Sequence, residues 1–232
     1  MMGVMDDGFI SFYKDAGFGP IKDTVCVPKT AIKYYEHRLP PQLITYWRYL
    51  GWAGFANGLF WLVNPADYKH VVDLWLDGSP FEYHDQYHVI ARSAFGELFL
   101  WGEKTADSLT IQTLFVQIFP SDRSKDIGLV SDQRMDVIIQ EFMATLCQPN
   151  LDILDSNEQP LFRQLYNCLG PLTANEMYGW ASLSMEYPPH RAEHFSRVHA
   201  ITHMSQLAKL KERHIMQDIG LVLEQAYIET LM

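Results

Sequence analysis

The stretch Gly51–Pro65, which reads GWAGFANGLFWLVNP, constrains the fold of this chain more than any other. Turns that contain glycine, at Gly51–Trp52 and Ala56–Gly58, lie on either side of apolar residues, and Leu59–Val63 then follow without a break. An apolar run that ends at Asn64–Pro65 is typical of a strand buried on both faces, although a buried helical turn is not excluded by periodicity alone. We therefore predict that this stretch lies in the core of a sheet.

A second stretch, Val89–Lys104 (VIARSAFGELFLWGEK), has the same apolar character. It predicts a β-hairpin whose strands are His88–Arg92 and Glu97–Gly102. Two further strands are predicted at Leu109–Ile111 and Leu114–Phe119. In this hypothesis the two apolar stretches form the core of the sheet, and the rest of the chain packs on it.

Several other segments have the apolar spacing and the end signals of amphipathic helices. The predicted helices are Ala31–Arg38, a helix from Pro41 to Leu50, a helix from Asn64–Pro65 through Trp75, a helix capped by Ser131 that reaches Leu146, and Leu161–Leu169. Tyr178–Met185 is predicted to be strand-like. After Pro188–Pro189 we predict mostly helix, with Phe195 and Val198 on its apolar face, and a last amphipathic segment after Arg213.

The composition excludes some classes of protein. Of the 232 residues, 48% are hydrophobic, so the chain can bury a substantial core. The formal net charge of −10 argues against a broad phosphate-binding surface, because such a surface needs clustered Lys and Arg. Three widely spaced cysteines, Cys26, Cys147 and Cys168, form neither a disulfide framework nor a metal-binding pair. Since no signal peptide or membrane span is visible either, we expect a cytoplasmic protein.

One motif points to metal chemistry. His190–His194 (HRAEH) fits the H-x-x-E-H pattern of inverted zinc proteases. On a helix, His190 and His194 would share a face and could hold Zn²⁺, with Glu193 as the general base. The motif directly follows Pro188–Pro189, and no second motif marks a third ligand. We favour a solvated helix face for this segment and keep a metal-dependent hydrolase as an alternative.

The remaining residues predict no catalytic site. Two further histidine pairs, His84 with His88 and His199 with His203, have helical spacing but no accompanying carboxylate motif. Neither a phosphate-binding glycine loop nor a G-x-S-x-G elbow is present. We therefore predict that the protein is not an enzyme and that it binds no metal and no cofactor.

Acidic residues are concentrated in two parts of the chain. Between Asp67 and Asp107 there are eight acidic residues and three basic ones, and between Asp132 and Glu186 there are eight acidic residues and two basic ones. An acidic face of this kind favours docking of a basic partner, because charge complementarity raises association rates and selects partners. An ordinary solvated surface is the alternative interpretation.

Longer motifs carry a family resemblance. Leu39–Tyr68, together with Tyr87–Lys104, resembles the GAD-like domain family. Leu169–Pro189 (LGPLTANEMYGWASLSMEYPP), together with Val198–Leu210, resembles the C-terminal domain of type VI secretion immunity proteins. The two halves occur in this order in immunity proteins that are paired with toxic DNases, and the resemblance covers nearly all of the chain.

The resemblance implies a fold of the α+β class. A mixed or antiparallel sheet flanked by helices would form a GAD-like domain over residues 1–148. A mainly helical immunity-protein C-terminal domain would follow over residues 149–232. Pro149–Pro160, which carries three acidic residues between prolines, is the predicted connection between the two parts.

The resemblance also implies a function. The protein would bind a cognate type VI secreted nuclease toxin in the cytoplasm of the producing bacterium and neutralise it, protecting the producer and its siblings. The family pattern supplies no catalytic residue. Because a DNase needs a basic cleft for phosphates, an acidic inhibitor can occupy that cleft without binding nucleic acid or membrane itself. The predicted contact residues are acids and aromatic anchors on one helix and the loop after it: Asp73, Trp75, Asp77, Glu82, Tyr83 and Asp85.

Besides the hydrolase that would use His190, Glu193 and His194, a second alternative remains open. GAD domains occur as insertions in tRNA-charging enzymes. The chain could therefore be an adaptor that delivers a toxin or binds tRNA-related machinery, although its net charge disfavours direct RNA binding.

Overall fold

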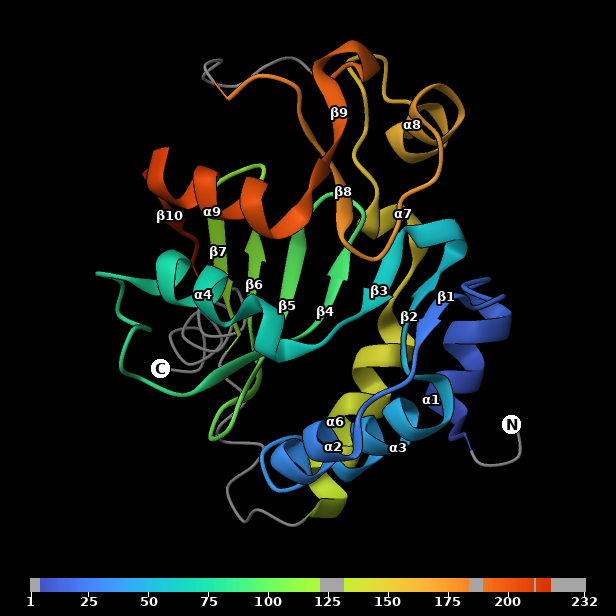
Figure 1. Cartoon of the computed structure of the whole chain (residues 1–232), viewed down its shortest axis with the longest axis vertical. Coiled ribbons are helices and arrows are strands. Elements are labelled where there is room, and N and C mark those ends of the chain that lie inside the picture. Colours follow the sequence, from blue (N-terminus) through green and yellow to red (C-terminus); the bar gives the residue numbers. More distant parts are fainter. Residues whose placement is uncertain (1–4, 122–131, 184–189, 211, 218–232) are drawn as a thin grey trace, which may run out of the picture.

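The computed structural model of the chain describes residues 5–121, 132–183, 190–210 and 212–217 (Figure 1). Within this part the fold is α+β, as predicted, and its centre is one large mixed sheet. The sheet has the strand order β1-β2-β3-β4-β5-β6-β7-β10, in which neighbours pair antiparallel except for β10 and β7, which are parallel. The strands are β1 (Lys22–Val25), β2 (Trp52–Phe55), β3 (Phe60–Leu62), β4 (Tyr87–Ser93), β5 (Glu97–Gly102), β6 (Ala106–Gln112), β7 (Gln117–Pro120) and β10 (His214–Ile215).

The stretch Gly51–Pro65 crosses the sheet as predicted. It forms β2, a 3₁₀ turn at Ala56–Gly58, and β3, whose three residues are all buried. Gly51 adopts φ +75°, and a Cβ at this position would lie 2.4 Å from the carbonyl oxygen of Val25. Only glycine therefore lets the chain turn from a helix into β2 so close to the neighbouring strand.

Helices cover both faces of the sheet. They are α1 (Asp7–Ile10), α2 (Lys29–Tyr35), α3 (Pro41–Leu50), α4 (Pro65–Leu76), α6 (Asp132–Thr145), α7 (Gln148–Leu151), α8 (Leu161–Leu169) and α9 (Ala200–Leu210), and a π-helical turn at Ser11–Asp15 continues α1. The predicted helices at Pro41–Leu50, Leu161–Leu169 and after Asn64 are confirmed. Ser131, the predicted cap of α6, lies outside the described residues.

Strand alternation explains why an unbroken apolar run suits this sheet. Phe60 packs against Phe142 of α6, with ring centroids 6.5 Å apart. The next residue, Trp61, lies on the opposite face, where the guanidinium of Arg92 is 5.3 Å from its ring and hydrogen-bonds Tyr68 of α4. Because successive strand residues point to opposite faces, and α4 covers one face while α6 covers the other, each residue of the run is buried.

The segment after residue 170 differs from the prediction. Phe195–His199, predicted as a helical face, is strand β9, which pairs antiparallel with β8 (Glu176–Trp180) in a separate two-stranded sheet. α9 then begins at Ala200 and lies beside α4 (Figure 1). Helical spacing over the few residues of a strand is not distinctive, and its pairing partner determines the outcome.

The predicted strand at Tyr178–Met185 is confirmed only for its first residues, because β8 ends at Trp180 and residues 184–189 lie outside the described part. The predicted amphipathic segment after Arg213 begins instead with β10, which pairs with β7. Its continuation, residues 218–232, is also outside the described part.

The C-terminal segments rest directly on the large sheet. One buried cluster of hydrophobic residues includes side chains from both parts of the chain. Polar groups cross the seam as well: Arg92 donates to the carbonyl oxygens of Ala174 and Glu176, both at 2.8 Å, and Trp180 Nε1 donates to the Leu114 carbonyl at 3.2 Å. The boundary near residue 149 stays a prediction.

Candidate partner-binding site

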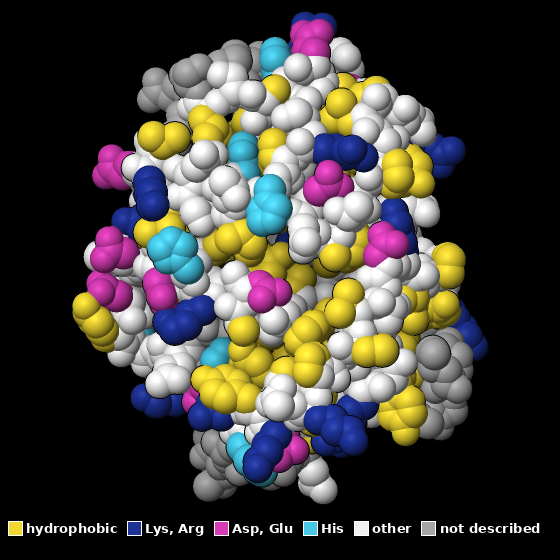
Figure 2. Space-filling model, in the orientation of Figure 1, with side chains coloured by type: hydrophobic (Ala, Val, Ile, Leu, Met, Phe, Trp, Pro, Cys, Tyr) yellow, Lys and Arg dark blue, Asp and Glu magenta, His cyan; other side chains and the backbone are white. Residues whose placement is uncertain are grey.

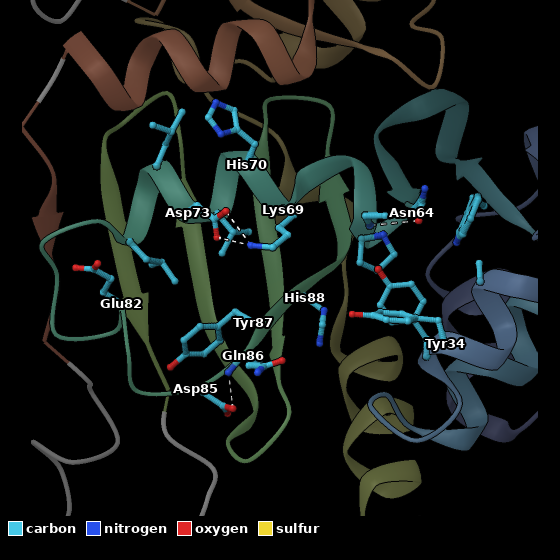
Figure 3. A pocket seen from close by; sticks show the side chains of 18 of the residues that line it. Tyr34, Asn64, Lys69, His70, Asp73, Glu82, Asp85, Gln86, Tyr87 and His88 are labelled. Atoms are coloured by element: carbon cyan, nitrogen blue, oxygen red, sulfur yellow. Dashed lines mark hydrogen bonds and ion pairs between the residues drawn. The ribbon is translucent and has the colours of Figure 1, made fainter.

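A groove of about 1060 Å³ opens between α4, the segment Asp77–His88 and α2 (Figure 3). It contains five of the six residues predicted to contact a partner, namely Asp73, Asp77, Glu82, Tyr83 and Asp85. The other side chains used below are Tyr34, Tyr35, Trp52, Lys69, Leu74, Tyr87 and His88, which also line it. We call this feature the acidic groove.

The outer face of α4 forms one wall. The Asn64 side chain accepts a hydrogen bond from the Ala66 N–H at 3.2 Å, which fixes the start of the helix beside the groove. One turn further on, Lys69 and Asp73 form an exposed ion pair at 2.9 Å. Asp77 follows at the end of the helix, and within the described chain no hydrogen bond or ion pair engages its carboxylate.

The loop after α4 carries Glu82 and Tyr83. Glu82 Oε2 accepts the N–H of Gly78 at 2.8 Å, which closes the loop back onto the end of the helix. Hydrogen bonds from the Tyr83 hydroxyl and from this N–H lower the pKa of Glu82, because they favour its charged carboxylate. Tyr83 is 89% exposed, the most open of the large hydrophobic side chains on the described surface.

Asp85, at the floor of the groove, stabilises a turn of the large sheet. Its Oδ2 accepts three hydrogen bonds from the turn between β5 and β6, from the Lys104 N–H at 2.8 Å, the Thr105 N–H at 2.9 Å and the Thr105 hydroxyl at 2.8 Å. The other oxygen accepts from the Gln86 N–H at 2.7 Å. Most of the acceptor capacity of this carboxylate is therefore used inside the protein.

Aromatic side chains from α2 form the opposite end of the groove. Tyr35 packs edge-on against Trp47 and His88, with ring centroids 5.6 and 5.5 Å away, and its burial raises the pKa of its hydroxyl to about 12. Tyr34 is 53% exposed, and the guanidinium of Arg38 lies 4.2 Å above its ring. The groove thus combines an acidic side with an aromatic side. Figure 2 shows hydrophobic side chains in the middle of this face of the molecule, with Asp and Glu side chains around them.

Trp75 does not belong to this surface, which corrects the prediction that it contacts a partner. The side chain is 0% exposed, and its Nε1 donates to the Met204 carbonyl of α9 at 3.1 Å. Trp75 lies on the apolar face of α4, which is occupied by α9. Of the two predicted aromatic anchors, Tyr83 alone is accessible.

The H-x-x-E-H motif does not have the geometry that a zinc site needs. Ala192–His194 is a 3₁₀ turn and Phe195 already begins β9, so His190 and His194 do not share a helical face. The His190 ring lies against Phe115 and Trp180, with centroids 5.3 and 5.9 Å away. Glu193 pairs with Arg191 at 3.3 Å. The motif therefore lacks the helix on which the hydrolase alternative depends.

The other histidine pairs are also separated by the fold. His84 lies in the loop and is exposed, whereas His88 lies on β4 and its Nε2 is 2.8 Å from Glu103. His203 is buried in α9, where burial lowers its pKa to about 4, and His199 precedes the helix at the surface. Within the described ranges, no group of three or more His, Cys, Asp or Glu side chains could hold a metal ion, and no helix there is long and apolar enough to cross a membrane.

Comparison with known proteins places the groove within a recognised unit. Residues 7–115 match the GAD-like domain. Every residue that lines the acidic groove falls within this GAD-like part. A search of curated proteins finds no match to the chain.

Among solved structures, the chain is similar to the crystal structure of Atu4351 from Agrobacterium tumefaciens. The TM-score is 0.74, the sequence identity is 22%, and the likeness covers 88% of this chain and 91% of that chain. At this identity the likeness shows a shared fold. That fold extends beyond the GAD-like part into the C-terminal segments.

Proposed function

We propose that this protein is an immunity protein that binds and neutralises a cognate nuclease toxin of the type VI secretion system in the cytoplasm of the producing cell. The observation that carries the proposal is the acidic groove, where the described residues of the lining include four carboxylates and a single opposing Lys or Arg, Lys69. The resemblance of Leu169–Pro189 and Val198–Leu210 to immunity-protein C-terminal domains supports the same function.

The proposed mechanism is binding rather than catalysis. A DNase presents clustered Lys and Arg to the phosphates of its substrate. Carboxylates on the rim of the groove, at Asp73, Asp77 and Glu82, would meet that cationic surface and keep DNA away from it. Such charge pairs steer the two proteins together at rates above those of neutral pairs, which suits an antidote that must capture every toxin molecule.

The decisive experiment uses a candidate toxin, a nuclease sought among the genes next to the one that encodes this chain. Purified chain is mixed with the nuclease domain, and plasmid degradation and the dissociation constant are measured at two salt concentrations. We expect wild-type chain to block degradation at equimolar ratio. The triple variant Asp73→Lys, Asp77→Lys and Glu82→Lys should bind at least about a hundred-fold more weakly, mainly through a slower association rate.

A matched control reverses three exposed acids that do not line the groove: Asp15→Lys, Glu158→Lys and Glu193→Lys. It changes the net charge by the same amount and should still neutralise the toxin. Asp85 is left intact because it holds the turn between β5 and β6. If wild-type chain neither binds nor blocks the nuclease, the function is wrong. If the triple variant behaves like the control, the function stands and the groove is not its site.

A further inference from the structure

We infer that the acidic groove receives an extended, arginine-bearing segment of the toxin, whose guanidinium groups lie between the Tyr34 end and the carboxylates of α4 and its following loop. This inference rests on the proposed function for the identity of the partner. It adds the chemistry of the recognised segment, which the proposed function leaves open.

The charges of the groove select a cation. Asp73 and Asp77 lie one turn apart on α4, and Glu82 extends the row along the loop. The Lys69–Asp73 pair is exposed on both sides, at 77% and 58%, so it contributes little and can be exchanged for an incoming cation. Asp77 is next to it and, in the described part of the chain, no hydrogen bond or ion pair neutralises its carboxylate.

The aromatic side chains favour arginine over lysine. A guanidinium is planar, so it can stack on a ring face while its N–H groups hydrogen-bond a carboxylate, whereas an ammonium acts as a strongly hydrated point charge. Tyr34, Tyr35 and Trp52 line the end of the groove next to the start of α4. Tyr87 lies on the side that faces Lys69 and Asp73 (Figure 3). Flat apolar surface and carboxylates therefore occur in the same groove.

Two arginines of the chain bind residues that line the groove. Arg38 stacks on Tyr34 at 4.2 Å while its Nε lies 3.5 Å from the Glu103 carboxylate. Arg213 donates through Nη1 to the carbonyl oxygen of Leu74, in the last turn of α4. The C-terminal end of a helix carries a partial negative charge, which favours such a cation. Arg38 thus combines ring stacking with a nearby carboxylate, as we assign to the toxin, and Arg213 shows that the C-terminal end of α4 accepts a guanidinium.

The size of the groove favours a segment over a single ion. About 1060 Å³ lies at the upper end of the range of pockets for small ligands, and the lining extends from α2 to the loop beyond α4. Several side chains of an extended chain could fill it. A free small cation would leave most of the aromatic lining in contact with water.

The inference can be tested without the toxin. Three capped peptides, Gly-Arg-Gly-Arg-Gly and its lysine and citrulline counterparts, are titrated into the full chain by calorimetry at low salt, and amide NMR shifts locate the binding site. Citrulline has nearly the shape of arginine but no charge. We expect the arginine peptide to bind at least about ten-fold more tightly than the citrulline peptide and about three-fold more tightly than the lysine peptide. The amide NMR shifts should occur at Asp73, Asp77 and Tyr87.

The variant Tyr34→Leu with Asp77→Asn should weaken arginine-peptide binding about ten-fold. Its control, Tyr49→Leu with Asp15→Asn, changes the same residue types at exposed positions outside the groove and should bind like wild type. Equal binding of the arginine and citrulline peptides, shifts elsewhere on the protein, or no effect of the groove variant overturns the inference. A chain that neutralises the toxin yet fails these tests retains the proposed function. If the chain passes the peptide tests but does not neutralise the toxin, the proposed function is wrong.

Discussion

The large sheet and the C-terminal segments after residue 170 are stabilised in different ways. In the sheet, β3, β4 and β5 are buried by apolar side chains between α4 and α6. The hairpin β8–β9 and α9 also bury apolar residues, but they are fixed in place by directional hydrogen bonds to the sheet and to α4. The backbone joins them too, because the Tyr178 N–H donates to the Ala94 carbonyl at 2.9 Å. The sheet therefore serves as the template on which the C-terminal segments are positioned.

Among the substitutions that weaken the attachment of the C-terminal segments to the sheet, Arg92→Met should have the largest effect. Arg92 is 0% exposed and donates to the Tyr68 hydroxyl and to the carbonyls of Ser93, Ala174 and Glu176. The substitution leaves these buried acceptors without their donor, so we expect a loss of about 3–5 kcal/mol in the free energy of unfolding. Urea unfolding measures the loss, and amide exchange should increase more in β8 than in β5.

Arg48→Met is the control for this prediction, because its side chain is 54% exposed and pairs with Glu36 at 3.7 Å. We expect a change within about 0.5 kcal/mol. If Arg92→Met increased amide exchange equally in β8 and β5, the two regions would unfold as one unit. The interpretation of the sheet as a template for the C-terminal segments would then be wrong.

A smaller loss in the free energy of unfolding is expected when the pH is lowered. His203 of α9 is 4% exposed, its Nε2 has no hydrogen-bond partner in the described structure, and burial lowers its pKa from 6.5 to about 4. Between these two pH values the unfolded chain binds a proton that the folded chain does not. Stability from this residue is therefore complete above pH 6.5 and falls by about 3 kcal/mol as the pH decreases to 4.

His203→Met should keep the stability at pH 7 and flatten this acid dependence in urea unfolding followed across pH. His37→Gln, at a side chain that is 87% exposed, should leave the wild-type curve unchanged. A variant at position 203 with the full acid dependence of the wild-type chain would contradict the assignment.

The smallest of the three effects belongs to Trp75→Phe. The variant retains a large ring in the core but loses the hydrogen bond from Nε1 to the Met204 carbonyl. We expect a loss of about 1–2 kcal/mol in the free energy of unfolding and faster amide exchange in α9 than in β4. Unchanged exchange in α9 would show that apolar packing alone holds this helix.

The sheet and its flanking helices could be predicted from the sequence because their signals are local. The run Leu59–Val63, the hairpin around Gly96 and the cap at Asn64 each determine structure within a few residues. β9 and β10 could not be predicted in this way. β9 depends on its partner Glu176–Trp180, and β10 is a two-residue strand whose signal is its pairing with β7.

The candidate site, like the fold, could be predicted only where its residues are close together in the sequence. The acids Asp73, Asp77, Glu82 and Asp85 follow one another along the chain, so charge alone grouped them. Tyr34 reaches the groove from α2, far from them in sequence, and tertiary packing is needed to bring it there. The spacing of Tyr34 and Arg38 is compatible with their stacking, but it does not indicate that Tyr34 reaches the groove. Trp75 was misassigned because spacing on a helix shows an apolar face but not the helix that covers it.

The acidic residues of the groove differ in how easily they can be replaced during evolution, because Asp85 has a second role. Its carboxylate belongs to the groove floor and also holds the turn between β5 and β6, so replacing it alters the sheet as well as the surface. Asp73 and Asp77 have no such second role among the described contacts, apart from the weak pair with Lys69. Under the proposed function, a lineage exposed to a changing toxin could therefore vary the rim one residue at a time while it keeps the floor. Partner preference would then diverge between related chains along α4 without any change in fold.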